Sequence, residues 1–344
     1  MKNFNLNFIS KFLFIVITLA MSSLGYSKIT KPKIHSTIML DAYFYGDENA
    51  NNGAYNNMNR FQVRKATMAL EGKLEENLEY IFEFGIATCV GTGNQLQIME
   101  AKLDYFITDN IRIGMGQGHV LKGFTTKTEC SARLSLEKPE FLKSFGACHP
   151  LGVVTSSYFE LGEKMGLELE LAALNGEGST LNGEHEYNAG MIFDSPLSGL
   201  SFSGFYNQTE KQYYDENYEK FSANGFRAGG GANYLNHGFW LTSEYYLGEG
   251  FATKDQKMGA WYAQVGYEFF IGAERLNAVQ PYVKYTSWIR DKKSEIEHNY
   301  FEIGANVKLT ALSKIKIAYE NVDDKSEEIV KSPNTLSIRL QSGF

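Results

Sequence analysis

Apolar and polar side chains alternate along most of the chain after residue 33. In residues 167–174 every second side chain is leucine or alanine, and the first two between them are glutamates. Residues 301–309 and 314–320 repeat this period of two. Because successive side chains of a strand point to opposite faces, the period predicts strands with one apolar and one polar face, and hence an all-β fold.

The candidate strands are separated by connections that alternate in length. Sixteen strands are predicted to start near residues 34, 59, 78, 96, 111, 151, 165, 187, 200, 224, 238, 257, 278, 299, 314 and 334. Residues 109–110 and 195–199 form short turns, whereas residues 208–221 and 322–333 form long polar loops. Tight turns at one end and long loops at the other are typical of a transmembrane antiparallel up-and-down β-barrel, whose long loops are extracellular.

A soluble β-sandwich is the alternative, since its strands also alternate. The even strand number, an export signal before the strands and a final amphipathic strand favour the barrel. A length of 344 residues first suggests about two soluble domains of ~150 residues each. A barrel turns its apolar half to lipid and its polar half to water, so one domain without a sizeable packed core suffices.

Composition excludes two further classes. Apolar residues make up 43 % of the chain and the mean hydropathy is −0.29, so the chain is too polar for a bundle of transmembrane helices. The net charge is −7, from 33 basic and 40 acidic residues. Nucleic acid is therefore not an expected partner.

The N-terminal segment has the pattern of a secretory signal peptide. Lys2 and Lys11 precede an apolar run, and the small residues Gly25 and Ser27 follow it, at the positions where a signal peptidase requires small side chains. A run of about ten apolar residues is short of the ~20 needed to span a bilayer, which disfavours a permanent membrane anchor. We expect cleavage after Ser27, so that residues 1–27 are a signal peptide and residues 28–344 form the barrel.

The chain ends on an aromatic residue. Ile338, Leu340 and Phe344 share the apolar face of the last candidate strand. This pattern resembles the sorting signal of bacterial outer-membrane proteins, and it predicts the outer membrane of a Gram-negative bacterium as the location, with its lipid and the barrel assembly machinery as partners. Aromatic residues also stand where interfacial girdles are expected, namely Tyr43, Phe44, Tyr80, Tyr105, Trp240, Tyr245, Trp261, Tyr267 and Trp288.

Several short motifs, in order along the chain, resemble the phosphate-selective porin O and P family. They are residues 61–74 (FQVRKATMALEGKL), 80–84 (YIFEF), 100–106 (EAKLDYF), 111–117 (IRIGMGQ) and 261–267 (WYAQVGY). The resemblance implies a homotrimeric, sixteen-stranded outer-membrane channel for passive diffusion of small hydrophilic solutes and ions, with anions such as phosphate as candidates. In the family, selectivity depends on lumen arginines and on lysines at the constriction.

The polar faces of the candidate strands carry charges of both signs. Their basic residues are Lys65, Lys102, Arg112, Arg227, Lys284, Lys308, Lys316 and Arg339. Their acidic residues are Glu71, Glu79, Glu83, Glu100, Asp104, Glu168, Glu170, Asp194, Glu244, Glu268, Glu302 and Glu320. This acidic excess leaves the ion preference open, so the resemblance alone does not establish phosphate selectivity.

The third long loop, at about residues 118–150, is the predicted pore-constricting segment. A barrel of sixteen strands has an aqueous lumen that must be narrowed to be selective. Charges facing each other across a narrow gap discriminate ions by sign. The candidate constriction residues are Lys122, Lys127, Arg133, Lys138 and Lys143 from the loop, with Lys65, Lys102 and Arg112 from the wall. The alternative is that these are solvated charges without a filter role.

The chain has three cysteines, too few for a disulfide scaffold. Cys130 and Cys148 flank much of the third loop and are a candidate disulfide in an oxidising periplasm, with Cys89 left over. Three free thiols or a different pair remain alternatives.

No residue pattern predicts an enzyme, a cofactor or a metal site. The six histidines are scattered without metal-ligand spacing, although His119 and His149 flank the third loop and could approach each other. Glu168 and Glu170 share one face, but lumen carboxylates explain them better than acid–base catalysis. The alternatives to a channel are an outer-membrane adhesin or structural barrel acting through its long extracellular loops and, third, an outer-membrane hydrolase.

Overall fold

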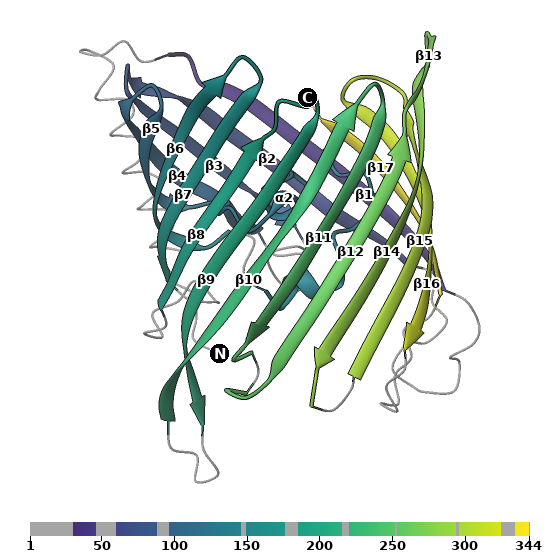
Figure 1. Cartoon of the computed structure of the whole chain (residues 1–344). Coiled ribbons are helices and arrows are strands. Elements are labelled where there is room, and N and C mark those ends of the chain that lie inside the picture. Colours follow the sequence, from purple (N-terminus) through teal and green to yellow (C-terminus); the bar gives the residue numbers. More distant parts are fainter. Residues whose placement is uncertain are drawn as a thin grey trace.

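The computed structural model of the protein describes residues 30–45, 60–87, 96–145, 149–175, 185–214, 220–251, 253–293, 296–324 and 334–343. This part of the chain contains seventeen strands (Figure 1), which are β1 (Lys33–Tyr45), β2 (Arg60–Glu75), β3 (Leu78–Ala87), β4 (Leu96–Thr108), β5 (Ile111–Gln117), β6 (Leu151–Gly162), β7 (Met165–Asn175), β8 (His185–Asp194), β9 (Leu200–Tyr214), β10 (Lys220–Asn236), β11 (Phe239–Glu249), β12 (Lys257–Tyr267), β13 (Phe269–Ala273), β14 (Leu276–Asp291), β15 (Ile296–Lys308), β16 (Ser313–Asp324) and β17 (Thr335–Gly343). Two short helical turns, α2 (Phe124–Lys127) and η3 (Glu140–Lys143), lie between β5 and β6. None of the helices described is long and apolar enough to cross a membrane.

The strands form one closed antiparallel sheet. β1 pairs with β2 on one side and with β17 on the other, where Thr37 lies opposite Gly343. β12 and β13 both pair with β14 and are separated only by Glu268, so together they occupy one position in the barrel. The barrel therefore has sixteen strands in the described residues, and closure leaves no unpaired edge in lipid. The predicted all-β up-and-down barrel is confirmed.

The strands begin close to where the sequence pattern predicts them. β3, β4, β5, β6 and β7 begin at the predicted residues 78, 96, 111, 151 and 165. β10 begins at Lys220 rather than near residue 224.

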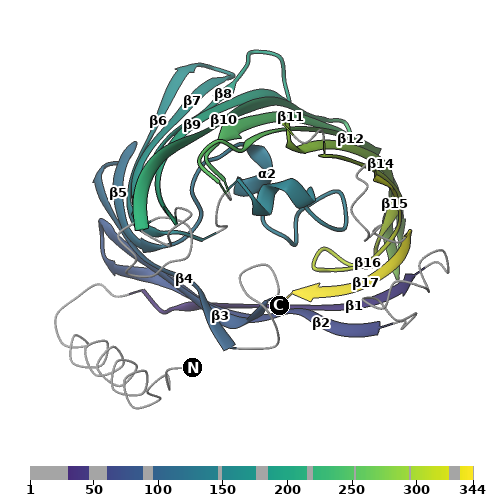
Figure 2. The ribbon, with the colours of Figure 1, turned by 90° about the horizontal axis from the view of Figure 1, so that it is seen from below.

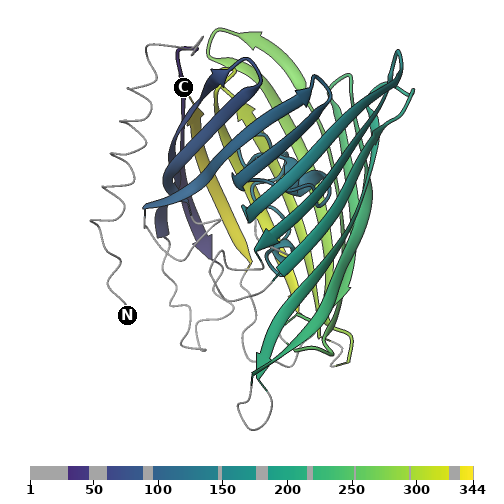
Figure 3. The same ribbon diagram turned by 90° about the vertical axis from the view of Figure 1, so that its left-hand side faces the viewer.

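Short turns gather at one end of the barrel and longer connections at the other (Figures 1 and 3). The short turns are residues 76–77, 109–110, 163–164, 195–199, 237–238, 274–275 and 309–312. β1 begins and β17 ends at this turn end, which in outer-membrane barrels is periplasmic. The predicted signal peptide and Phe344 lie outside the described residues.

The period of two places apolar side chains outside and polar ones inside. Leu171 is 63 % exposed on the outer face, whereas the adjacent Glu170 is 6 % exposed in the lumen. Trp261 and Tyr285 pack against each other, with ring centroids 5.2 Å apart, on outward-facing positions. Leu340 of the proposed sorting signal is also exposed on this face, at 48 %.

Two tryptophans expected in the lipid-facing girdles face the lumen instead. Trp288 is 8 % exposed within an apolar cluster, and Trp240 packs against a second cluster, formed by Leu134, Leu136, Tyr282 and Ala318. The girdle prediction is wrong for both, because their strands bury apolar side chains against a segment inside the barrel.

That segment is residues 118–150, of which the structure describes 118–145 and 149–150, and we call it the inner loop. Figure 2 shows α2 within the ring of strands. Phe141 is 0 % exposed, and its ring centroid lies 5.2 Å from that of Tyr246 on β11. The whole cluster comprises Phe141, Leu142, Phe145, Phe205, Tyr246, Phe251, Met258, Ala260, Tyr262 and Trp288. The barrel thus contains an apolar cluster that the sequence analysis did not predict, and burial of each large apolar side chain in it contributes about 1.5–3 kcal/mol to holding the inner loop.

Candidate functional site

Acidic side chains of the wall hold the first part of the inner loop. Glu170 on β7 accepts a hydrogen bond from the amide of Leu121 at 2.6 Å, and the Asn188 side chain on β8 donates to the Leu121 carbonyl at 3.1 Å. Glu186 on β8, which is 2 % exposed, forms an ion pair with Nζ of Lys122. These carboxylates are therefore occupied by the loop rather than facing open water.

Glu244 on β11 is a second anchor. Its carboxylate accepts hydrogen bonds from the amides of Phe124 at 2.6 Å and Thr125 at 3.1 Å, and from the hydroxyl of Tyr262 at 2.6 Å. Gly123 has a φ of 98°, and a Cβ there would lie 2.2 Å from Oε1 of Glu244. Glycine at this position therefore lets the loop backbone reach the carboxylate.

Basic side chains of the opposite wall hold the middle of the inner loop by its carbonyl groups. Lys316 on β16 is 0 % exposed and donates to the carbonyls of Arg133 at 2.7 Å and Ser135 at 3.0 Å. Arg339 on β17 donates from Nη1 to the carbonyl of Leu136 at 2.7 Å. Peptide carbonyl groups of the loop therefore provide hydrogen-bond partners for these buried basic side chains, as buried polar groups require.

Arg339 is also the centre of a charged network. It donates to both carboxylate oxygens of Asp41 at 2.7 Å and pairs with Glu137 of the inner loop. Glu137 pairs in addition with Arg64 on β2 at 2.6 Å. Burial alone would raise the pKa of Glu137, but Arg339 and then Arg64 lower it to about 2.

The inner loop is expected to loosen in acid. Because the pKa of Glu137 falls from 4.5 to about 2 on folding, its ion pairs stabilise the loop fully above pH 4.5 and are lost as the pH falls through about 2. The measured quantity is the rate of pepsin cleavage within the loop, divided at each pH by the rate for the Glu137→Gln variant. We expect this ratio to increase as the pH is lowered from 4.5 to about 2. A constant ratio between wild type and variant would contradict this role for Glu137.

The eight candidate constriction residues differ in their surroundings in the structure. The ion-pair partners of five of them are Glu186 for Lys122, Glu168 for Lys127, Glu83 for Lys65 (2.8 Å), and Asp104 for Lys102 (3.0 Å) and Arg112 (3.9 Å). Lys122 is buried against the wall, so its charge serves to anchor the loop. Lys143 is the last residue of η3.

Lys65, Arg133 and Lys138 lie close enough to His149 for their charges to act on its imidazole. Burial is the main cause that lowers the pKa of His149 to about 2, and the charges of these three residues and the neighbouring His119 add to it. Burial also lowers the pKa of His119, with Arg133 and Lys65 adding to the effect. The charges of Lys65 and Arg133 therefore act on both imidazoles, against the opposing charge of Glu129 at His119.

Sequence reasoning missed Arg64 as a lumen residue. The β1–β2 pairing shifts register between Met39 and Leu40, which removes Arg64 from strict alternation. Both Arg64 and its neighbour Lys65 therefore reach lumen carboxylates. A bulge of this kind has no signature in the period of two.

The docking of the inner loop was also missed in its detail, although the sequence carries a signal for it. Fully solvated loops rarely contain a series of large apolar residues, yet this one carries Val120, Leu121, Leu134, Leu136, Phe141, Leu142 and Phe145, all buried. Apolar residues inside a long loop therefore indicate that the loop packs against the wall.

Two of the three cysteines lie outside the described residues, namely Cys89 and Cys148. Cys130 lies in the inner loop, with Sγ 3.2 Å from Nη1 of Arg133. The Cys130–Cys148 disulfide remains a prediction.

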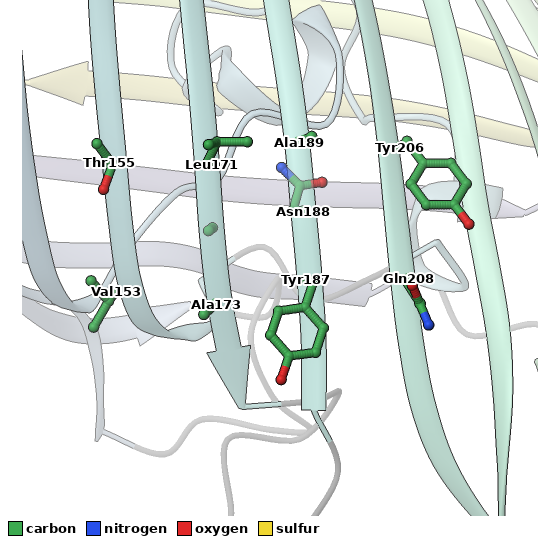
Figure 4. Close-up of a pocket in the computed structure, with 10 residues that line it drawn as sticks. Val153, Thr155, Leu171, Ala173, Tyr187, Asn188, Ala189, Tyr206 and Gln208 are labelled. Carbon is green, nitrogen blue, oxygen red and sulfur yellow. The ribbon is translucent and has the colours of Figure 1, made fainter.

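A groove of about 510 Å³ lies on the outer face of β6 to β9 (Figure 4). Leu171, Tyr187 and Tyr206 line it and point away from the lumen, at 63 %, 59 % and 51 % exposure. The groove therefore faces lipid and is not part of the channel.

Comparison with known proteins places the chain among porins. The sequence profile described as "Phosphate-selective porin O and P" matches residues 41–226. No curated protein matches the sequence. Similar solved structures include OmpF of Salmonella typhi in complex with daunomycin (11 % identity, TM-score 0.64, covering 91 % of this chain and 98 % of that one) and the anion-selective porin of Comamonas acidovorans (10 %, 0.62, 91 % and 99 %). The outer membrane channel DcaP of Acinetobacter baumannii is also similar (12 %, 0.61, 91 % and 97 %).

Proposed function

Because this chain belongs to the phosphate-selective porin O and P family and is an outer-membrane porin of a Gram-negative bacterium, we propose that its inner loop narrows the water-filled channel and favours small anions. The observation that carries this proposal is that the charges of Lys65 on β2 and of Arg133 and Lys138 in the inner loop all act on His149. Anions passing between the loop and β2 would meet a positive potential, and cations would be repelled.

The acidic excess of the wall does not oppose this proposal. Glu170, Glu186 and Glu244 accept hydrogen bonds from, or form ion pairs with, the inner loop, and Glu302 pairs with Lys284. Lys316 and Arg339 are likewise engaged by the loop. A count of charges by sign therefore does not measure the field that a passing ion meets.

Phosphate is one small anion that such a channel would admit, and the family description supports it as a candidate. The family and the fold are those of a channel, and we propose that transport involves no catalytic step. We further propose a homotrimer, supported by a similar structure, OmpT of Vibrio cholerae, that is described in a trimer form. Removal of residues 1–27 at export remains part of the same proposal.

Planar-bilayer recording tests the channel function. The protein purified from outer membranes should produce discrete conductance steps in KCl that scale linearly with voltage, because passive diffusion has no other driving force. The same preparation after heat denaturation is the control. Folded protein that inserts without producing conductance would contradict the proposal and favour an adhesin acting through its extracellular loops.

A further inference from the structure

Three potential metal ligands meet where the inner loop leaves and rejoins the wall. Glu100 lies on β4, His119 follows β5, and His149 precedes β6. One ligand atom from each lies within 4.8 Å of the other two, and Nε2 of His119 is 3.8 Å from Oε1 of Glu100. The two imidazole rings are 4.1 Å apart, centroid to centroid.

Both imidazoles have an unused polar atom. Among the described residues, Nδ1 of His119 and Nδ1 of His149 are buried and have no hydrogen-bond partner. His149 is only 8 % exposed. A buried polar atom without a partner is uncommon and costs about 1–3 kcal/mol, so it indicates a bound water or ion.

We propose that Glu100, His119 and His149 form a site for one divalent transition-metal ion of the zinc type. Two imidazoles and one carboxylate are a recurring three-residue ligand set for Zn²⁺, with a fourth position left to water. Ligand-to-metal distances of about 2.0–2.2 Å require the three side chains to approach slightly more closely than they do here.

The site lies beside the positive charges of Lys65, Arg133 and Lys138, against which Glu100 contributes one negative ligand. Lys65 is paired with Glu83 at 2.8 Å and Lys102 with Asp104 at 3.0 Å, which partly neutralises both. A bound ion would tie wall strand β4 to both ends of the inner loop. If the proposed anion preference is correct, the ion would also strengthen it, because it adds positive charge beside Lys65.

Isothermal titration with ZnCl₂ tests the site directly on the full-length protein after chelator treatment. We expect saturable binding of one Zn²⁺ per protomer. His119→Ala and His149→Ala should each weaken binding by at least about 10-fold. Loss of a group that only hydrogen-bonds to a metal ligand already costs about this much, so loss of a ligand should cost no less. Glu100→Gln, which keeps the size of the side chain, guards against a folding defect and should weaken binding in the same way.

His35→Ala is the matched control. His35 also pairs with one carboxylate, that of Glu71 at 3.0 Å, but at the exposed turn end of β1. This variant should bind Zn²⁺ as the wild type does. Absence of Zn²⁺ binding to the wild type, or an affinity in all three site variants equal to that of the wild type, would overturn the site whatever the channel's ion preference is.

A reversal-potential measurement with Zn²⁺ present separates the two proposals. Zn²⁺ should increase the preference of the wild type for chloride and leave the His149→Ala channel unchanged. Zn²⁺ binding without an effect on ion preference would keep the site and contradict the location of the anion path.

Discussion

Replacement of Arg339 by alanine is expected to detach the middle of the inner loop from β17. The change leaves Asp41 and Glu137 without the guanidinium that they share, and the Leu136 carbonyl without its donor. Removal of one partner from a buried ion pair destabilises by about 3–5 kcal/mol, which makes this the largest effect we expect from a single residue. The rate of proteolysis within the inner loop and the single-channel conductance should both rise.

Two variants sharpen this test. Arg339→Lys keeps the charge but not the two-pronged hydrogen bonding to Asp41, so an intermediate effect is expected. Arg290→Ala removes an exposed arginine at the end of β14 and should leave both readouts unchanged. A folded Arg339→Ala barrel whose loop resists proteolysis as the wild type does would show that Arg339 does not hold the loop.

Neutralisation of Lys65 and Lys138 together is expected to abolish most of the anion preference. A unit charge ~4 Å from an ion is worth about 1 kcal/mol even in bulk water, so loss of two charges should change the anion-to-cation permeability ratio on the order of tenfold. The reversal potential of the Lys65→Gln/Lys138→Gln channel in a KCl gradient gives this permeability ratio.

The control for this pair is Lys164→Gln, which removes an exposed lysine from the turn between β6 and β7. Its permeability ratio should equal that of the wild type. Because the effect is electrostatic, the difference between the double variant and the wild type should shrink in concentrated salt. An unaltered ratio in the double variant at low salt would mean that ions pass elsewhere.

The barrel could be predicted from the sequence because the pattern that specifies each strand lies within that strand's own residues. Each strand carries its own period of two, so the starts of β3 to β7 and the alternation of short and long connections follow from neighbouring residues. Closure then needs no further signal, since an open sheet edge is not tolerated in lipid. The strand interruption at Glu268 and the register shift beside Arg64 break that local rule and were not predicted.

The contacts of the inner loop could not be predicted in the same way. Lys316 and the Arg133 carbonyl are 183 positions apart, and no periodicity relates them. Treating every lumen charge as facing water gave a wall with an acidic excess, whereas the structure engages Glu186, Glu244 and Lys316 in holding the loop. Trp240 and Trp288 were misplaced for the same reason, because the loop offers apolar side chains a second place to be buried.

The candidate site was predictable in part. Lys65, Arg133 and Lys138 were identified from charge and position, and their charges all act on His149, but their place in a constriction remains a prediction. Lys122 was selected by the same criteria but lies buried against Glu186. The sequence identifies which side chains carry charge, whereas only the folded loop determines which of them meet a passing ion.

The reversal potential of the wild-type channel in a KCl gradient tests the central claim most directly. K⁺ and Cl⁻ have nearly equal mobilities in water, so any deviation from zero reflects the charges of the pore. We expect a potential displaced toward the chloride equilibrium potential, because we propose that Lys65, Arg133 and Lys138 make the side of the loop that faces β2 positive. A potential displaced toward that of potassium would contradict a channel that the inner loop makes anion-preferring.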